Sequence, residues 1–153
     1  MDASIDAVRV AGTPDGPVGV VTLGVSETDD VLPISVGLEE AASIARGLEA
    51  TDAGRPLTHD LLLDVVEELG GRLSRVVVSD VVEDTYVADL HLQTPRREVI
   101  VDARPSDSLA LAARTNAPIE ITEGVFEEGR RPAEEFAVLE DIREVGEPEE
   151  GGW

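Results

Sequence analysis

The chain of 153 residues contains neither cysteine nor lysine. The lack of cysteine excludes disulfides, zinc sites built on thiolates and catalysis by a thiol nucleophile, and it permits a reducing compartment. Aromatic residues are scarce as well, with one Trp, one Tyr and two Phe. So few rings offer no platform on which the bases of a single-stranded nucleic acid could stack.

Long apolar runs are also missing. No uninterrupted stretch approaches the roughly 18 residues that a membrane-spanning helix requires. The opening residues, MDASIDAV, lack the basic and apolar parts of a signal peptide. We therefore expect a soluble, cytoplasmic protein that makes no contact with a membrane.

The charge of the chain is strongly one-sided. It has 33 Asp and Glu residues against 12 basic residues, all of them Arg, which gives a formal net charge of −21 at pH 7. The acids are spread over the whole chain, so the surplus belongs to the surface. We interpret it as halophilic adaptation to a cytoplasm of molar salt, where the Debye length falls to about 3 Å and self-repulsion is screened. In net terms, the basic footprint of a typical nucleic-acid-binding protein is absent.

The pattern of apolar positions and turn residues predicts a single α+β domain of about seven strands, largely antiparallel. Two consecutive helices are expected early, over residues 37–50 and 61–69, and one buried helix is expected late, over residues 109–113. The predicted strands cover residues 5–10, 18–25, 31–36, 72–82, 85–94, 99–101 and 118–122.

The domain is expected to occupy residues 1–128. Residues 129–153 are interpreted as an acidic C-terminal extension, partly helical and then disordered. Within it, Phe136, Leu139 and Ile142 would form the apolar stripe of an amphipathic helix over residues 133–145.

One stretch, VIVDARPSDSLALAAR at residues 99–114, combines a strand, a break and an apolar helix. The β-branched residues 99–101 favour a strand, which we expect to be central in the sheet. Pro105 cannot continue such a strand but is favoured in the first turn of a helix. The alanine-rich helix that follows has almost no polar side, which indicates burial.

Four polar residues of this stretch, Asp102, Arg104, Ser106 and Asp107, would meet at the N-terminus of the helix. Unpaired N–H groups, a guanidinium and carboxylates could bind an anion or a metal there. The alternative is structural: Asp102 and Asp107 cap the helix, and Arg104 pairs with them.

Three segments together resemble the bifunctional nuclease domain family. They are LPISVGLEEAASIARGL at residues 32–48, RPLTHDLLLDVVEELGG at 55–71 and VIVDARPSDSLALAARTNAPI at 99–119. Their order and spacing match the family, and the resemblance covers roughly residues 5–128. It implies an α+β fold, degradation of DNA and RNA, and self-association, with a dimer favoured.

Mapped onto this sequence, the resemblance implies a nuclease site. The implied catalytic residues are His59, Asp60, Asp102 and Asp107, and the implied substrate-binding residues are Arg104 and Ser106. Asp102 and Asp107 could hold a divalent cation, Mg²⁺ or Mn²⁺, through oxygen ligands. Histidine side chains change charge near neutral pH, so His59 could act as an acid or a base.

Two functions therefore compete. The first is a metal-dependent nuclease that hydrolyses phosphodiester bonds of RNA, DNA or both. The second is a non-enzymatic module that oligomerises or binds a small anion, in which the DARPSD segment at residues 102–107 is structural. The apolar helix after that segment supports the second, because it is typical of packing.

Overall fold

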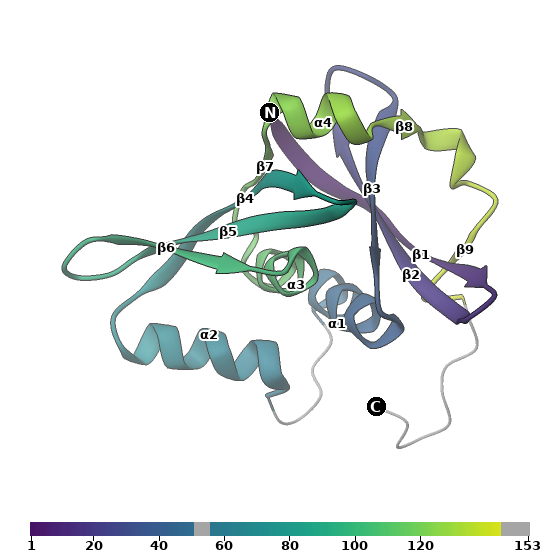
Figure 1. The fold of residues 1–153 in the computed structure, drawn as a ribbon. Coiled ribbons are helices and arrows are strands. Elements are labelled where there is room, and N and C mark those ends of the chain that lie inside the picture. Colours follow the sequence, from purple (N-terminus) through teal and green to yellow (C-terminus); the bar gives the residue numbers. More distant parts are fainter. Residues whose placement is uncertain (51–55, 145–153) are drawn as a thin grey trace.

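Two long hairpins supply most of a twisted, mixed sheet in the computed structural model, which describes residues 1–50 and 56–144 (Figure 1). Among these residues nine strands run in the order β6-β5-β4-β7-β1-β2-β3-β8, and β9 pairs with β1. The contact between β4 and β7 is parallel and the other pairings are antiparallel. The strands are β1 (Asp2–Thr13), β2 (Gly16–Val25), β3 (Asp30–Val36), β4 (Arg72–Val82), β5 (Thr85–Gln93), β6 (Glu98–Ala103), β7 (Ile119–Ile121), β8 (Arg131–Pro132) and β9 (Glu140–Asp141).

Four α-helices accompany the sheet within the described residues. They are α1 (Leu38–Glu49), α2 (Thr58–Glu68), α3 (Pro105–Thr115) and α4 (Glu123–Gly129). The predicted α+β class, the two consecutive early helices and the late helix are thus confirmed. None of the helices found in the described ranges has the length and apolar character needed to cross a membrane.

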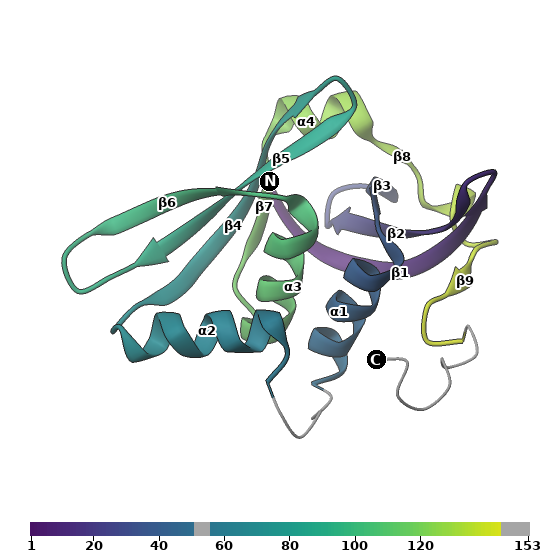
Figure 2. The same ribbon diagram turned by 60° about the horizontal axis from the view of Figure 1, so that its bottom comes forward.

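Helices α1 and α3 lie side by side inside the curve of the sheet and form the centre of the core (Figure 2). Leu109 and Ala110 of α3 and Ile44 of α1 are fully buried, as the apolar character of the late helix predicted. Small residues allow this close approach, because a Cβ atom added to Gly47 would lie 2.9 Å from the Cβ of Ala113. The core therefore fixes how α3 leaves the sheet.

Helix α2 is less embedded than its neighbours. It has no buried residue; Leu61, Leu62 and Val65 are exposed, and so is Leu69 directly after its end. Leu63 on its opposite side packs against the core. The helix therefore contacts the domain along one narrow face, and its second apolar face is not covered by the other described residues.

The strand predicted to be central is instead an edge strand. The β-branched run lies in β6, which pairs with β5 on one side only, and its Ile100 is 57% exposed. Val101 is also exposed, at 40%. A β-branched composition favours any strand and does not report how many neighbours the strand has, so the sequence could not distinguish edge from centre.

The amphipathic helix predicted over residues 133–145 is wrong for its described part, residues 133–144. Only Ala133–Glu135 forms a short 3₁₀ helix, and the chain then turns into β9. The N–H of Ile142 donates to the carbonyl of Val8 in β1, and Arg9 donates to the carbonyl of Leu139. Pairing with the free edge of β1 outweighs the helical spacing of the apolar residues. The predicted disorder after residue 144 lies outside the described residues.

Candidate functional site

The first turns of α2 and α3 meet beside β6, and this junction brings together three predicted site residues. Nε2 of His59 lies 2.9 Å from Oδ1 of Asp107. Nε of Arg104 donates to Oδ2 of Asp107 at 2.9 Å, and Nη2 of Arg104 donates to Oδ1 at 3.2 Å. Pro105 begins α3, so Asp107 falls in its first turn, three residues after Arg104. Of the structural alternative, the pairing of Arg104 with Asp107 is confirmed. The predicted caps are not, because neither Asp102 nor Asp107 accepts a backbone N–H of α3 within the described residues, and Arg104 does not pair with Asp102 there.

Asp107 is held in its ionised form. Burial raises the pKa of its carboxyl, but the hydrogen bonds from Arg104 and His59 outweigh burial and leave the pKa below the ordinary aspartate value. The same hydrogen bond raises the pKa of Arg104. Arg104 remains 67% exposed, whereas the His59 side chain is only 15% exposed. The Arg104 guanidinium therefore faces solvent while it is bound to the more buried His59–Asp107 pair.

A second set of hydrogen bonds holds His59 at Nδ1, on the side of the ring opposite Asp107. Oγ of Ser43 in α1 lies 2.7 Å from Nδ1 of His59, and Nη2 of Arg114 in α3 donates to that Oγ at 3.2 Å. Because Ser43 accepts from Arg114, its own hydroxyl hydrogen is free to point at Nδ1. This network assigns the ring hydrogen to Nε2, facing Asp107. Ser43 and Arg114 thus set the tautomer and orientation of His59.

Arg114 also fixes Asp60, which the sequence placed beside His59 in the site. Nε of Arg114 donates to Oδ1 of Asp60 at 2.7 Å, and the N–H of Leu57 donates to Oδ2 at 3.0 Å. Burial raises the pKa of Asp60, but these bonds bring it below the ordinary value. Asp60 lines a different cavity, of about 220 Å³, together with Arg114. The structure therefore separates Asp60 from the Asp107 side of His59.

An open hollow of about 670 Å³, here called the His59 hollow, lies between α2, β5, β6 and the start of α3. His59, Asp102, Arg104 and Asp107 line it, and Leu62, Leu90 and Leu111 supply apolar wall. Ser106 does not reach it. That residue is buried and lines a second hollow, of about 380 Å³, which shares Arg104 with the first.

Asp102 and Asp107 are poor ligands for the divalent cation that the sequence analysis predicted on them. Asp107 is occupied by Arg104 and His59, and exposed Asp102 lies opposite Asp89 across the β5–β6 ladder. Within the described ranges no group of three or more His, Cys, Asp or Glu side chains could hold a metal ion. Divalent cations of this class prefer several oxygen ligands, so the arrangement does not fit one as it stands. Metal binding stays a prediction.

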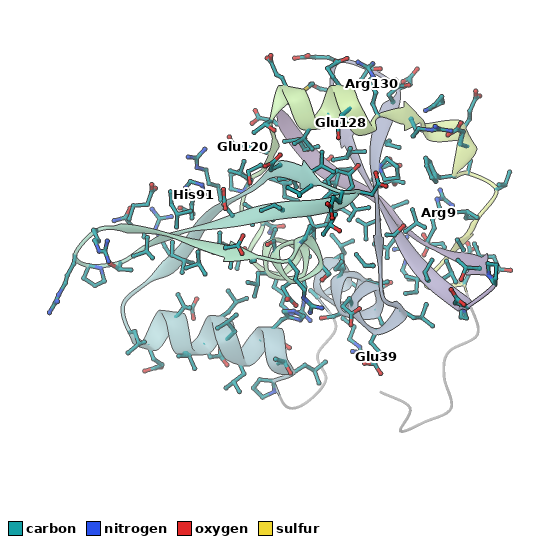
Figure 3. The ribbon with its side chains drawn as sticks, in the orientation of Figure 1. Arg9, Glu39, His91, Glu120, Glu128 and Arg130 are labelled. Atoms are coloured by element: carbon teal, nitrogen blue, oxygen red, sulfur yellow. The ribbon has the colours of Figure 1, made fainter. Side chains whose placement is uncertain are left out.

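The other histidine takes no part in this site. His91 lies on the face of β5 turned away from the helices (Figure 3), opposite the face that carries Leu90. It is 7% exposed, and its Nδ1 lies 3.7 Å from Glu98. The site is therefore built on one histidine.

Sequence reasoning missed Ser43 and Arg114. Both lie inside segments of the family resemblance, but neither stands in a recognisable motif. The one available signal was Arg114 itself, a charged residue at the end of an otherwise apolar helix. Such a residue requires partners, and the structure supplies them from α1 and α2.

The profile of the bifunctional nuclease domain matches residues 21–134, which include the whole of this site. An "uncharacterized protein" of Mycobacterium tuberculosis is 38% identical over 125 residues, covering 82% of this chain and 73% of that protein. Bifunctional nuclease 2 of Arabidopsis thaliana is 28% identical over 94 residues, covering 60% of this chain and 29% of the plant protein. Bifunctional nuclease 1 of Oryza sativa subsp. japonica is 26% identical over 97 residues, with coverage of 61% and 29%. Because this match spans most of the chain, the chain belongs to the bifunctional nuclease domain family.

Proposed function

We propose that this protein is a nuclease that hydrolyses phosphodiester bonds of RNA, DNA or both in the His59 hollow. The observation that carries the proposal is the exposed Arg104, held over the His59–Asp107 pair at the mouth of an open hollow. The names of the plant relatives, bifunctional nucleases, support the same chemistry. A guanidinium is suited to this role because its planar donors match two phosphate oxygens.

The proposed chemistry begins when Arg104 exchanges the Asp107 carboxylate for a phosphate of the substrate. Without its cation, Asp107 becomes a stronger base and can accept a proton from water. The water oxygen attacks phosphorus, the bond from phosphorus to one ester oxygen breaks, and the departing oxygen takes a proton from solvent. Arg104 offsets the charge that builds on the phosphoryl oxygens, and His59 keeps Asp107 oriented through Nε2.

No step of this scheme depends on a metal. Mg²⁺ or Mn²⁺ on Asp102 and Asp107 is a separate proposal, because Arg104 would first have to leave Asp107. A cation bound there would supply charge neutralisation at the phosphoryl oxygens. Cleavage measured with Mg²⁺, with Mn²⁺ and with EDTA decides between the two versions.

The test is cleavage of end-labelled single-stranded RNA and DNA in molar potassium chloride. Asp107→Asn and Arg104→Met are expected to lower the rate by about 10²-fold or more. Arg131→Met is the matched control, because Arg131 forms a similar exposed, two-point ion pair with Glu135 on a different part of the surface. Equal cleavage by all four proteins would refute the assignment of the site.

One observation favours the non-enzymatic alternative. Both ring nitrogens of His59 are engaged, by Ser43 and Asp107, so the ring also ties α1, α2 and α3 together. His59→Ala separates the two functions. A folded variant without cleavage supports the nuclease, whereas an unfolded variant, together with a wild type that cleaves neither nucleic acid, supports a structural module.

A further inference from the structure

A second hollow, here called the Ser106 hollow, adjoins the His59 hollow. It has a volume of about 380 Å³, and Thr85 and Arg104 line both hollows. The starts of α1 and α3 border it, because Gly37 and Ser106 also contribute to its wall. Pockets that take small molecules have volumes of about 300–1,000 Å³. The Ser106 hollow is therefore large enough for a planar ring system, next to the arginine that we assign to the substrate phosphate.

The hydroxyl of Ser106 has no partner in the part of the chain that the structure describes. Ser106 is 7% exposed, and its Oγ forms no hydrogen bond with residues 1–50 or 56–144. Among these residues, Nδ1 of His91 is the one side-chain atom that is both fully enclosed and without a partner. Oγ of Ser106 must therefore touch open space, and the open space that Ser106 lines is this hollow. A buried hydroxyl in that position is available to hydrogen-bond a ligand.

The carboxylate of Glu40 lies beside the same hollow. Glu40 belongs to the first turn of α1 and lines the hollow. Its side chain folds back over Gly37, because the nearest atoms that a Cβ added to Gly37 would meet are Oε2, Cδ and Oε1 of Glu40. The φ of Gly37 is −64°, which any residue can adopt. Glycine therefore serves here to leave room for the carboxylate, which forms neither a hydrogen bond nor an ion pair with the described residues.

The lining of the Ser106 hollow favours a neutral ligand that presents hydrogen-bond donors. Two carboxylates, those of Glu40 and Asp84, line the hollow, so a phosphate would meet like charge there. A metal ion is disfavoured as well, because Arg104 lines the hollow and no group of three or more His, Cys, Asp or Glu side chains within the described ranges could hold one. Ile34 and Val36 supply apolar wall, against which the flat face of a nucleobase can pack.

We propose that the Ser106 hollow binds a guanine base of the nucleic acid whose phosphate lies on Arg104. The proposal rests on the proposed nuclease function, because that phosphate brings the base to the hollow. Guanine carries two adjacent donors, N1–H and N2–H, which match the two oxygens of the Glu40 carboxylate, and its neighbouring O6 accepts from the hydroxyl of Ser106. These groups are open to a protein only in unpaired bases. The preferred substrate is therefore single-stranded RNA or DNA, cleaved next to guanine.

The other bases do not fit the same groups. Adenine and cytosine each present one amino group beside an acceptor nitrogen, and uracil presents one N–H between two carbonyl oxygens. A carboxylate that accepts from one of these bases therefore faces a like partial charge on the neighbouring atom. Guanine is the base whose edge offers Glu40 two donors side by side, so this residue is expected to set the preference.

Nucleotide binding tests the hollow without any activity. Isothermal titration calorimetry in molar potassium chloride compares guanosine 3′,5′-bisphosphate with inosine 3′,5′-bisphosphate. Inosine keeps N1–H and O6 of guanine and lacks only the 2-amino group. The wild type should bind the guanosine compound roughly tenfold more tightly, as expected for the loss of one of two paired hydrogen bonds. Equal affinities, or no detectable binding of either compound, would overturn the proposal.

Two variants change the carboxylate in different ways. Glu40→Gln removes its charge, whereas Gly37→Ala keeps the charge and displaces the carboxylate without straining the backbone. Both should bind the two compounds with nearly equal affinity. Glu39→Gln is the matched control, because Glu39 is exposed in the same helical turn and does not line the hollow. Ser106→Ala should weaken the binding of both compounds alike, since both carry O6.

These variants also give the results that contradict the proposal. If the preference for guanosine survives in both Glu40→Gln and Gly37→Ala, the Glu40 carboxylate does not read the base. If Glu39→Gln loses the preference as well, the effect comes from the overall charge of α1 and not from contacts in the hollow. Either result would overturn the assignment of the base to the Ser106 hollow.

Cleavage separates this inference from the proposed function. Two end-labelled single-stranded RNAs carry either one guanine or one inosine at the same place in an otherwise guanine-free sequence. At low substrate concentration the wild type should cut beside guanine roughly tenfold faster than beside inosine. Equal cleavage of both would leave the nuclease standing and refute the guanine site. If neither RNA is cleaved while guanosine bisphosphate is still preferred in the titrations, the proposed function fails and the hollow remains a site for guanine nucleotides.

Discussion

Arg114 is the residue whose substitution should show most clearly how much the hydrogen bonds behind the candidate site contribute to folding stability. Its side chain is 8% exposed, and the guanidinium donates to Asp60, to the hydroxyl and carbonyl of Ser43, and to the carbonyl of Ala110. Arg114→Met keeps much of the aliphatic volume and removes every one of these bonds. Asp60 and Ser43 then lose a partner that their positions depend on.

The expected cost follows from the kind of bonds lost. Breaking a buried ion pair by removing one partner costs about 3–5 kcal/mol. Asp60 is 39% exposed, so water can partly replace the guanidinium, which places the loss near the lower end, at about 3 kcal/mol. For a chain of this size each kcal/mol shifts the melting temperature by about 2–4 °C. Arg114→Met should therefore melt roughly 6–12 °C below the wild type.

Thermal unfolding followed by circular dichroism in molar potassium chloride measures this shift. Arg104→Met is the matched comparison, because Arg104 also binds one aspartate but is exposed; its melting temperature should stay close to that of the wild type. Asp60→Asn added to Arg114→Met should restore part of the loss by removing the unpaired charge. If Arg114→Met melts within about 2 °C of the wild type, the network does not hold the helices together and the reasoning is wrong.

Three further predictions concern pH, packing and salt. The pKa of Asp107 is lowered in the folded state. The stability that its bonds contribute is therefore fully present above the unfolded pKa of about 3.9, and it is lost as the pH falls through the folded pKa. The melting temperature of the wild type should consequently fall more steeply on acidification than that of Asp107→Asn. Gly47→Ala should destabilise by about 1–3 kcal/mol through overpacking against Ala113, whereas Gly124→Ala, with open space around it, should be neutral or stabilising in urea titrations. Circular dichroism should report loss of structure when molar potassium chloride is replaced by dilute buffer, and an unchanged spectrum would rule out halophilic adaptation.

Local patterns were enough to predict most elements, and they failed where the outcome depended on distant partners. The spacing of apolar residues within a helix, or their alternation in a strand, is set by neighbours in sequence, so α1, α2, α3 and the β4–β5 hairpin could be found. The edge position of β6 depends on strand order, and the fate of residues 133–144 depends on the free edge of β1. Neither the edge position of β6 nor the structure of residues 133–144 can be predicted from the local spacing of apolar residues.

The same limit applied to the site. Arg104 and Asp107 are three residues apart, so their pairing could be predicted, and the family resemblance supplied His59. The contacts of Arg114 with Ser43 and Asp60 span 71 and 54 residues. They arise from the packing of α3 on α1 and α2, which no spacing rule anticipates. The positioning residues were therefore missed, whereas the histidine, the arginine and the two aspartates that line the hollow had all been predicted as site residues.

The absence of lysine is consistent with the geometry of these ion pairs. Arg104 donates from Nε and Nη2 to the two carboxylate oxygens of Asp107, and Arg131 donates to Glu135 from the same pair of nitrogens. In molar salt, attraction between exposed charges fades beyond about 3 Å, so an ammonium group gains little from a nearby carboxylate. A guanidinium retains its paired hydrogen bonds because they depend on shape as well as charge. In Arg104→Lys, the side chain should therefore bind Asp107 and a substrate phosphate more weakly. The variant should cleave more slowly than the wild type although the charge is kept. Wild-type cleavage by Arg104→Lys would mean that charge alone suffices.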